Sequence, residues 1–391
     1  MLAAPALYKQ YYCDRIQETT RQFSQNTDRE LSLTFEASNV TTHNSKNELI
    51  QRENATILSL VRNSELDGMI ESIQHVEYRF NKNYHYDWNF FNDEPFTEEF
   101  IKSVTEKVSG RAIFTTIPSS YWSIPSSIDQ DKMKKSMERL VKENVLYADQ
   151  ISYRHMCRFN SGFFHKMKAL ESYQYYWRVE PKIKFNCDIP YDVFTTMREE
   201  NKMYGFNMAM TEDSKTVRGL WDTVTEFFDE FPEYLEEGYN IDFISHHYIK
   251  GEIIFPKDVG NIEDKDRHYN LCHFWSNFEI ANLDFFRSKR YEAFFERLDS
   301  TGNFFYERWG DAPIHTLAVT FMLKPDQLHY FDNTGYFHKP NSNCPASQRV
   351  REELNCDCHK SRDFSFHRWS CIPRYFKVFE MEFPEGVHIN R

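Results

Sequence analysis

The sequence predicts an α/β fold in which strands and helices alternate to build one open sheet. From residue 56 onward, short apolar runs of strand length alternate with segments whose apolar residues recur at helical spacing. This alternation is typical of strand–helix–strand units with right-handed crossovers. The chain has 391 residues, of which 17% are aromatic, so it can bury a sizeable core and is too apolar to be disordered. Because no repeat or low-complexity linker divides it, we expect one compact unit.

The first predicted elements are a strand over residues 56–61 and a helix directly after it. The strand is a short apolar run of the kind that a buried parallel strand shows. Ser64, with Asp67 three residues later, resembles a capping box that would start the helix. Apolar side chains then recur at helical spacing at positions 66, 69, 70, 73 and 80.

The same alternation continues further along the chain. The aromatic run 88–91 predicts a second strand, which ends in the acidic turn 92–95, and a helix from about Thr97 and a strand over 112–117 come next. Later apolar stripes predict one helix through residues 133, 137, 140 and 141 and another through residues 217, 220, 221 and 224. Further strands are expected at 175–179 and 204–208.

Composition excludes several classes of function. The chain has only 12 Gly and no glycine-rich phosphate-binding motif, which argues against a dinucleotide-binding dehydrogenase and a P-loop enzyme. The net charge is -12 and no run of basic residues occurs, so nucleic acid is not an expected partner. An anionic ligand would need a metal ion or a few placed arginines to balance its charge.

Cysteines and sequons favour an oxidising secretory compartment. Four of the eight cysteines lie within the last 50 residues, and two glycosylation sequons begin at Asn39 and Asn54. Cys356 and Cys358 show faint metal-ligand spacing, but a second ligand pair is missing, so disulfides are favoured over zinc. No apolar stretch approaches the ~20 residues of a membrane span, and the opening residues suggest that an upstream anchor has been removed.

The polar residues that follow predicted strands are the first candidates for a site, because ligands of open α/β sheets bind at the carboxyl ends of the strands. Such residues stand at 62–63, 92–94 and 180–181. Glu180 follows a hydrophobic strand and is fixed by the next residue, a proline. It is a candidate oxygen ligand for a divalent cation that bridges a diphosphate. A buried pair with Arg178, or a plain turn, is the alternative.

Two further carboxylates lie in aromatic segments. In the segment 272–280, Asn277 and Glu279 share one side of an extended chain, where a carboxylate could stabilise or attack the anomeric carbon of a sugar. A capping or surface role is the alternative for Glu279. Asp311 is a natural N-cap for a helix that contains Pro313 in its first turn, and the neighbouring Trp309 could stack on a sugar ring.

Two other groups are candidates for binding phosphate or metal. If the segment 153–158 is helical, Arg154 and Arg158 share a face and could meet phosphate oxygens, although exposed ion pairing is the commoner use of this spacing. His338 lies in a turn-rich stretch, 335–340.

Taken together, these segments resemble the fungal Golgi α-1,2-mannosyltransferase family, the yeast glycolipid and glycoprotein mannosyltransferases. The resemblance runs in order over roughly residues 53–380. The matching stretches are ENAT at 53–56, HYDW at 85–88, NDEPF at 92–96, YRHMCRF at 153–159, YWRVEP at 176–181, NLCHFWSNFE at 270–279 and YERWGDAP at 306–313.

The resemblance implies an A-type glycosyltransferase fold, a single Rossmann-like nucleotide-binding domain with a mixed central sheet. It implies retaining α-1,2-mannosyl transfer from GDP-mannose to a mannoside acceptor in protein or lipid glycosylation, with Mn²⁺ as cofactor. We accordingly expect a stem or peripheral N-terminal segment at 1–50 and a catalytic glycosyltransferase domain at 51–391. The implied location is the Golgi lumen, as a type II membrane protein whose anchor and part of whose stem are missing from this chain.

The resemblance also implies roles for single residues. Glu180-Pro181-Lys182 stands where many fold relatives have an Asp-x-Asp metal motif, so only Glu180 can bind there and the distant His338 must help. The expected roles are Glu180 and His338 as Mn²⁺ ligands, Tyr153 near the donor or metal, Glu279 as the carboxylate nearest the anomeric carbon, Asp311 on the acceptor side, Arg62 near the nucleotide, and Arg154 or Arg158 assisting at the phosphates.

Two other classes of function remain open from the residues alone. A glycoside hydrolase acting on mannosides would also use paired carboxylates and sugar-stacking rings, and a non-catalytic mannoside-binding protein could share the fold. Residues 243–268 look like a longer insertion than the family leads us to expect. Because they stand just before the Glu279 segment, acceptor preference is the property that transfers least.

Overall fold

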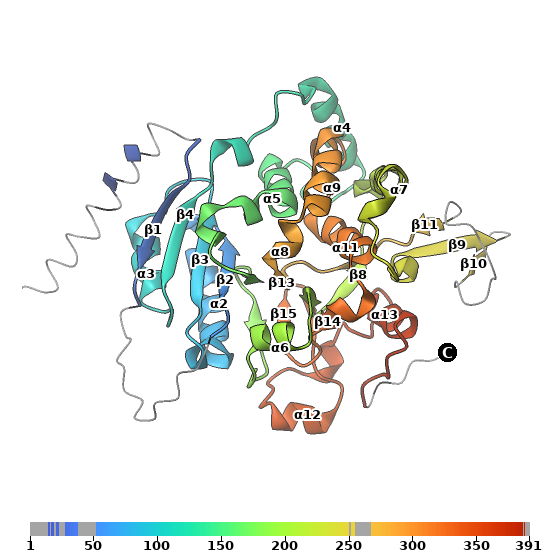
Figure 1. Ribbon diagram of the computed structural model, residues 1–391. Coiled ribbons are helices and arrows are strands. Elements are labelled where there is room, and N and C mark those ends of the chain that lie inside the picture. Colours follow the sequence, from blue (N-terminus) through green and yellow to red (C-terminus); the bar gives the residue numbers. More distant parts are fainter. Residues whose placement is uncertain are drawn as a thin grey trace, which may run out of the picture.

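The computed structural model of the protein describes residues 28–37, 52–249, 252–254, 267–385 and 387, with residues 15, 17, 18, 21 and 22 (Figure 1). The sequon at Asn39, Cys13 and most of the segment 1–50 lie outside the described residues.

The centre of the fold is an eight-stranded mixed sheet (Figure 1). Six strands run in one direction, while the edge strand β1 and the internal strand β13 run antiparallel to their neighbours. In spatial order the strands are β1 (Leu31–Phe35), β4 (Ala112–Thr116), β3 (Asp87–Asn92), β2 (Ala55–Leu60), β5 (Tyr175–Val179), β13 (Phe278–Asn282), β7 (Tyr204–Phe206) and β14 (Leu328–Tyr330).

Helices cover both faces of this sheet because its strands are apolar on both sides. On β5, Trp177 packs into one core and Tyr176 into the other, as the two-residue period of a strand requires. The core containing Trp177 is closed by α2 (Leu66–Arg79), α3 (Glu98–Thr105) and α6 (Val193–Glu199). The core containing Tyr176 is closed by α4 (Gln130–Lys142), α5 (Ile151–Gly162), α7 (Leu220–Glu230), α8 (Leu283–Phe286), α9 (Lys289–Ser300), α10 (Asn303–Tyr306), α11 (Asp311–Met322) and α13 (Ile372–Val378).

The predicted strands and helices are found in the structure in the predicted order, with small shifts at their ends. The expected start of α3 is confirmed, because the Thr97 hydroxyl accepts the Phe100 N–H at 3.2 Å. The expected capping role of Ser64 is wrong: this residue lies in a short 3₁₀ turn (Asn63–Glu65), and Glu65 is the N-cap of α2. Val217, expected in the α7 stripe, lies before that helix.

Part of the segment 1–50 belongs to the sheet. Strand β1 pairs antiparallel with β4, and its residues Leu31, Leu33 and Phe35 are buried. The predicted division of the chain at residue 50 remains a prediction.

Three small sheets and a short helix complete the described fold. The insertion 243–268 contributes strands that pair with one another, although much of it lies outside the described residues. The remaining elements are β6 (Lys184–Phe185), β8 (Ala209–Thr211), β9 (Ser245–Ile249), β10 (Glu252–Ile254), β11 (Arg267–Tyr269), β12 (Cys272–Phe274), β15 (Tyr336–His338), β16 (Asn341–Ser342) and α12 (Gln348–Glu353).

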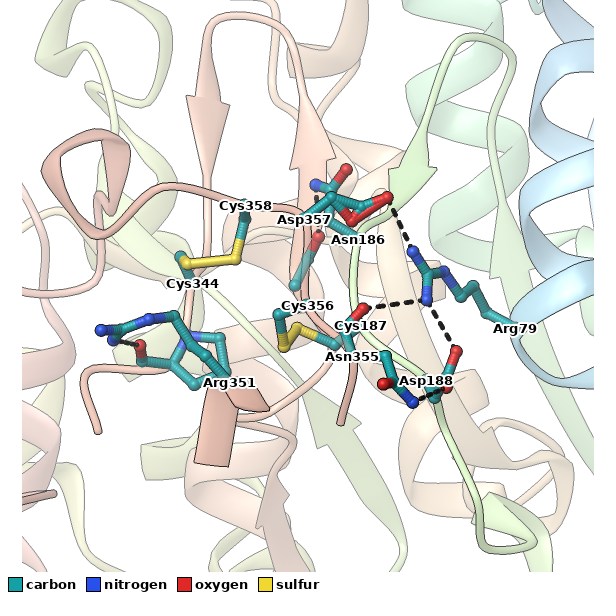
Figure 2. The surroundings of a disulfide bond; sticks show 12 residues. Arg79, Asn186, Cys187, Asp188, Cys344, Arg351, Asn355, Cys356, Asp357 and Cys358 are labelled. Atoms are coloured by element: carbon teal, nitrogen blue, oxygen red, sulfur yellow. Dashed lines mark hydrogen bonds and ion pairs between the residues drawn. A yellow bond between two sulfur atoms is a disulfide. The ribbon is translucent and has the colours of Figure 1, made fainter. Parts of the chain in front are cut away.

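Disulfides hold the C-terminal tail against this frame. The bonds are Cys187–Cys356, Cys272–Cys371 and Cys344–Cys358. They confirm the preference for disulfides over zinc, since Cys356 and Cys358 are both oxidised and offer no thiolate to a metal ion. Figure 2 shows Arg79 beside this cluster, where its guanidinium bonds Asp188 at 2.7 Å and Asp357 at 2.8 Å. The end of α2 is thereby joined to the tail.

Candidate active site

Glu180 lies in a tight turn that the first two turns of α2 hold in place. It directly follows β5, and Lys182 adopts a left-handed conformation with φ of 66°. The Lys182 N–H donates to the Gly68 carbonyl at 2.8 Å, and the Ser72 hydroxyl donates to the Glu180 carbonyl at 2.8 Å. A Cβ on Gly68 would lie 2.8 Å from the Lys182 side chain, so a glycine permits this close approach.

The pairing of two short strands places His338 beside Glu180. β6 begins four residues after Glu180, and it pairs antiparallel with β15, so that Phe337 lies opposite Lys184. His338, the next residue of β15, is thereby directed back toward the turn. Its Nε2 lies 3.5 Å from Glu180 Oε2. The structure therefore brings together the two side chains expected to bind a metal, although 157 residues stand between them.

The donor set of this pair fits a divalent cation. A carboxylate oxygen suits Mn²⁺, and an imidazole nitrogen is a common ligand of divalent transition metals. The separation of the two atoms is close to the ~3 Å between neighbouring ligands of one small divalent ion. The Nδ1 atom of His338 is buried and has no hydrogen-bond partner among the described residues. Since Arg178 donates to Glu180 Oε1 at 2.5 Å, Oε2 is the carboxylate oxygen that remains for a cation.

The charge of Glu180 also suits this role. Burial by itself would raise the pKa of the carboxyl, but the Arg178 charge and the His338 hydrogen bond lower it to about 2. Glu180 is therefore ionised at neutral pH, as a ligand of a hard cation must be.

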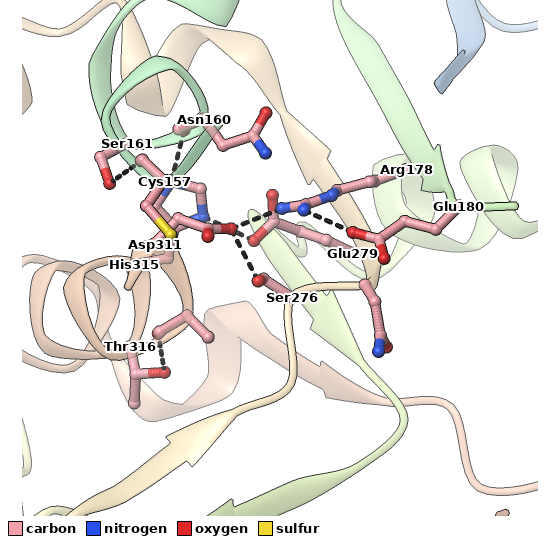
Figure 3. Close-up of polar contacts among 12 residues, drawn as sticks. Cys157, Asn160, Ser161, Arg178, Glu180, Ser276, Glu279, Asp311, His315 and Thr316 are labelled. Atoms are coloured by element: carbon pink, nitrogen blue, oxygen red, sulfur yellow. Dashed lines mark hydrogen bonds and ion pairs between the residues drawn. The ribbon is translucent and has the colours of Figure 1, made fainter. Parts of the chain in front are cut away.

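Arg178 lies at the centre of the polar cluster in Figure 3, between Glu180 and Asp311. Its Nη1 is 2.5 Å from Asp311 Oδ2, which also accepts the Ser276 hydroxyl at 2.8 Å. The expectation that Asp311 caps its helix is wrong: Gly310 is the N-cap and Asp311 the first helical residue. The reason is that Arg178 and Ser276 bind the Asp311 carboxylate instead.

Glu279 is fully buried beside this cluster, which excludes a surface role. It stands on β13 opposite Arg178 on β5. Its Oε1 accepts the Tyr176 hydroxyl, and its Oε2 accepts the Tyr204 hydroxyl at 2.6 Å and lies 2.7 Å from His315 Nδ1. Burial by itself would raise the pKa of Glu279, but His315, Arg178 and the tyrosine hydrogen bond together lower it. The carboxylate is held ionised and immobile.

Sequence reasoning missed the groups that bind these carboxylates. Ser276, Tyr176 and Tyr204 lie within predicted strands or motifs, but nothing in their spacing marks them as donors. One signal was available for His315: it follows Asp311 by four residues, so both lie on one face of α11.

Tyr153 lies half-buried on α5, between a ring and a cation. Tyr147 stacks on it at a centroid distance of 4.7 Å, and the Arg308 guanidinium lies 5.0 Å from its ring centre. Arg308 itself has φ of 107° and lies 3.8 Å from Glu212, a strained backbone of the kind that concentrates at functional sites. Burial raises the pKa of Tyr153 well above its ordinary value, so it is a neutral hydroxyl.

Arg154 and Arg158 do share α5, as expected, but both guanidinium groups have protein partners. Arg154 is fully buried and donates to the carbonyl of Gln150 at 3.2 Å and to that of Phe305 at 3.4 Å. Arg158 binds the Asp299 carboxylate through two hydrogen bonds, at 2.6 and 2.7 Å. In this structure both arginines link α5 to neighbouring segments, and their contact with phosphate remains a prediction.

This observation predicts that Arg158→Met lowers stability and leaves donor binding unchanged. The substitution leaves the Asp299 carboxylate, which is 23% exposed, without its partner, a loss of about 3 kcal/mol for a buried pair. Thermal or urea unfolding and the KM for GDP-mannose measure the two quantities. Arg349→Met is the matched control, because its pair with Glu353 is exposed and contributes less than about 0.5 kcal/mol. A large increase in KM would restore the phosphate role.

The structure also shows where Arg62 and Trp309 lie. Arg62 is exposed and stands two residues after the end of β2. Strand β2 pairs in parallel with β5, which leads to Glu180, so Arg62 and Glu180 follow strands that end at the same edge of the sheet. Trp309 is fully buried and donates to Glu307 at 2.8 Å. The expectation that Trp309 stacks on a sugar is therefore wrong, because its ring packs in the core near Phe304.

Comparisons with known proteins identify similar sequences and a similar solved structure. The sequence model of the family described as "Glycolipid 2-alpha-mannosyltransferase" matches residues 9–380. The chain is 44% identical to glycolipid 2-alpha-mannosyltransferase 1 of Candida albicans, over 85% of this chain and 73% of that protein. It is 43% identical to the O-glycoside alpha-1,2-mannosyltransferase omh1 of Schizosaccharomyces pombe, over 86% and 81%. The solved core-mannan synthase A of Aspergillus fumigatus, in a Mn/GDP form, superposes with a TM-score of 0.76 at 38% identity and covers 87% of this chain and 88% of that one.

Proposed function

Because this chain belongs to the glycolipid 2-alpha-mannosyltransferase family, we propose that it is a retaining α-1,2-mannosyltransferase that transfers mannose from GDP-mannose to a mannoside acceptor. The similarity confirms the predicted A-type glycosyltransferase fold and the predicted enzyme class. The Mn/GDP form of the similar structure supports Mn²⁺ as the cofactor of this chain.

The single observation on which this proposal depends is the convergence of Glu180 Oε2 and His338 Nε2 to 3.5 Å. A cation held there would neutralise the charge that develops on the leaving diphosphate. Arg62 lies at the same edge of the sheet, which supports its predicted place near the nucleotide.

The reaction breaks the bond between C1 of mannose and the β-phosphate oxygen, and it forms a bond from C1 to the 2-hydroxyl oxygen of the acceptor. Retention requires that the acceptor oxygen arrives on the face that the phosphate leaves. The acceptor proton passes to an oxygen of the departing GDP, so the chain need not supply a base. The sugar develops positive charge at C1 during this exchange.

Fixed charges around Arg178 suit such a transition state. Glu279 would provide negative charge, as the sequence led us to expect. The three donors that bind it support an electrostatic role over covalent attack, because a nucleophile would have to break those hydrogen bonds. Asp311 would orient the acceptor side through Arg178 and Ser276, and Tyr153 would contact the donor or the metal region.

The acceptor and the compartment are extensions of the same proposal. Relatives are named for glycolipids and for O-glycosides, so both are candidate acceptor classes alongside N-glycans. The three disulfides support an oxidising compartment, for which we propose the Golgi lumen and a type II topology. Of the helices that the structure describes, none is both long and apolar enough to cross a membrane.

The test is a transfer assay with GDP-mannose, Mn²⁺ and a panel of mannosides. We expect GDP release that depends on both the metal ion and the acceptor, with a product in which NMR shows an α-1,2 linkage. Hydrolysis of mannosides without nucleotide or metal would indicate a glycosidase. Binding of mannosides without any release of GDP would indicate a non-catalytic protein. Either result would overturn the proposal.

A further inference from the structure

We infer that Glu279 and His315 form a buried carboxylate–imidazolium pair, which makes His315 the positioning residue that keeps the negative charge of Glu279 fixed beside the site. The role in transfer rests on the proposed function, whereas the pair itself does not. The hydrogen bonds of the two His315 ring nitrogens lead to this inference.

The proton on Nε2 follows from its partner. Nε2 of His315 lies 3.0 Å from the backbone carbonyl of Asn160, and a carbonyl oxygen only accepts hydrogen bonds. The nitrogen must therefore donate, and Nε2 carries a proton. If the ring were neutral, Nδ1 would then present a lone pair.

The second proton follows from the partner of Nδ1. This atom lies 2.7 Å from Glu279 Oε2. A bare nitrogen facing an ionised carboxylate at this distance would set two lone pairs against each other without a hydrogen between them. One proton must therefore lie between Glu279 and His315. It belongs either to an imidazolium or to a neutral carboxylic acid.

The surroundings decide between these two states in favour of the ion pair. Glu279 already accepts hydroxyl hydrogens from Tyr176 and Tyr204, and donors favour the ionised carboxylate. Arg178, on the neighbouring strand, adds a positive charge on the same side. With His315 protonated, the side chains of the cluster carry three negative and two positive charges. The negative charges are those of Glu180, Glu279 and Asp311, and the positive ones are those of Arg178 and His315.

The groups around the pair act on its protonation in both directions. Glu279 raises the pKa of His315 against the effect of burial, Asp311 raises it further and Arg178 lowers it. The pKa of His165 is well below its ordinary value because of burial, so this ring is neutral. Tyr291 contributes a hydroxyl whose pKa burial raises. The charged and titratable groups facing the pair are Arg178 and Tyr176 on β5, Tyr204 on β7, Asp311 on α11, Tyr291 on α9 and His165 after α5.

The pair has a defined pH window. The pKa of Glu279 is lowered, so its contribution to stability is present above its unfolded value and is lost as the pH falls through the folded value. The pKa of His315 is raised, so its contribution is complete below its unfolded value of about 6.5 and is lost as the pH rises through the folded value. Both charges are present between these limits, a range that includes mildly acidic pH.

His315 can be tested with two amide variants that separate its two hydrogen bonds. In His315→Asn the amide nitrogen takes the approximate position of Nδ1 and still donates to Glu279, without titrating. In His315→Gln the amide reaches toward the Asn160 carbonyl and leaves Glu279 with one donor fewer. We expect His315→Gln to lower kcat roughly 10- to 100-fold, a range typical for loss of a supporting hydrogen bond, with unchanged Mn²⁺ and GDP binding. His315→Asn should retain most activity and lack the loss of kcat at alkaline pH that we expect of the wild type.

A measurement on the wild-type protein that does not depend on enzyme activity tests whether Glu279 and His315 form an ion pair. In ¹⁵N-histidine-labelled protein near pH 6.5, both nitrogens of His315 should resonate as protonated, and His315→Asn identifies the signals by their loss. An unprotonated Nδ1 would refute the ion pair. Wild-type kcat and an unchanged pH profile in His315→Gln would refute the positioning role. A wild-type protein that transfers no mannose would refute the proposed function, while the spectrum would still settle the pair.

Discussion

Replacing Glu180 with Gln should lower Mn²⁺-dependent turnover at least ~10³-fold, the largest effect that we expect from one side chain. A metal ion contributes several kcal/mol to the stabilisation of a departing charged group, and ~4 kcal/mol corresponds to ~10³ in rate. The variant keeps the shape of the side chain but loses the ionised oxygen that faces His338 Nε2 at 3.5 Å. Steady-state GDP release over a range of Mn²⁺ concentrations measures the effect.

The combination with His338→Ala makes this prediction sharper. If both residues hold one ion, removing the second ligand after the first costs little, so the double variant should turn over about as slowly as the worse single variant. The stabilisation of the protein by Mn²⁺ with GDP in a thermal melt should disappear in all three. Glu71→Gln is the control, since this carboxylate pairs with Lys184 on nearby β6 but is 40% exposed and outside the site. Additive losses in the double variant would mean that Glu180 and His338 act separately.

The second large effect is expected at Glu279. Glu279→Gln should reduce kcat at least ~10²-fold, the scale of losing one strong electrostatic group from a preorganised site. GDP binding should survive, because the carboxylate makes no contact with Glu180 or His338. Calorimetry with GDP and Mn²⁺, alongside the transfer assay, separates the two quantities. Near-normal turnover in this variant would dismiss the role of Glu279.

Tyr204→Phe serves as the graded control for Glu279→Gln. It removes one of the donors to Glu279 but keeps the carboxylate, so its loss of kcat should be much smaller. Mass spectrometry of the wild-type protein during turnover adds a further check, because a fixed charge predicts no mannosyl adduct. A mannosylated Glu279 would instead establish covalent attack.

Much of the local structure could be predicted from the sequence. The run 56–61 became β2 and the stripe from Leu66 became α2, because the spacing of apolar residues sets which face a short segment must bury. The ends of the helices were predicted less well. Ser64 was expected to cap α2, but the chain makes a 3₁₀ turn there. A pattern of apolar residues locates the end of a helix only to within one or two residues.

The site divides in the same way. Glu180 could be predicted from the sequence because a carboxylate after an apolar strand is unusual. That His338 is its partner was predicted only from the resemblance to the family. In the structure that pairing depends on the register of β6 against β15, and no pattern within either strand specifies a partner so distant in sequence.

Arg158 and Glu279 show what only the tertiary structure decided. Helical spacing correctly placed Arg158 on α5, yet its guanidinium binds Asp299, 141 residues away. Glu279 lies on a strand whose alternation was visible, yet its three donors come from β5, β7 and α11. Periodicity acts within a few residues and is written in the sequence, whereas the partner of a polar side chain depends on which distant segments the fold brings beside it.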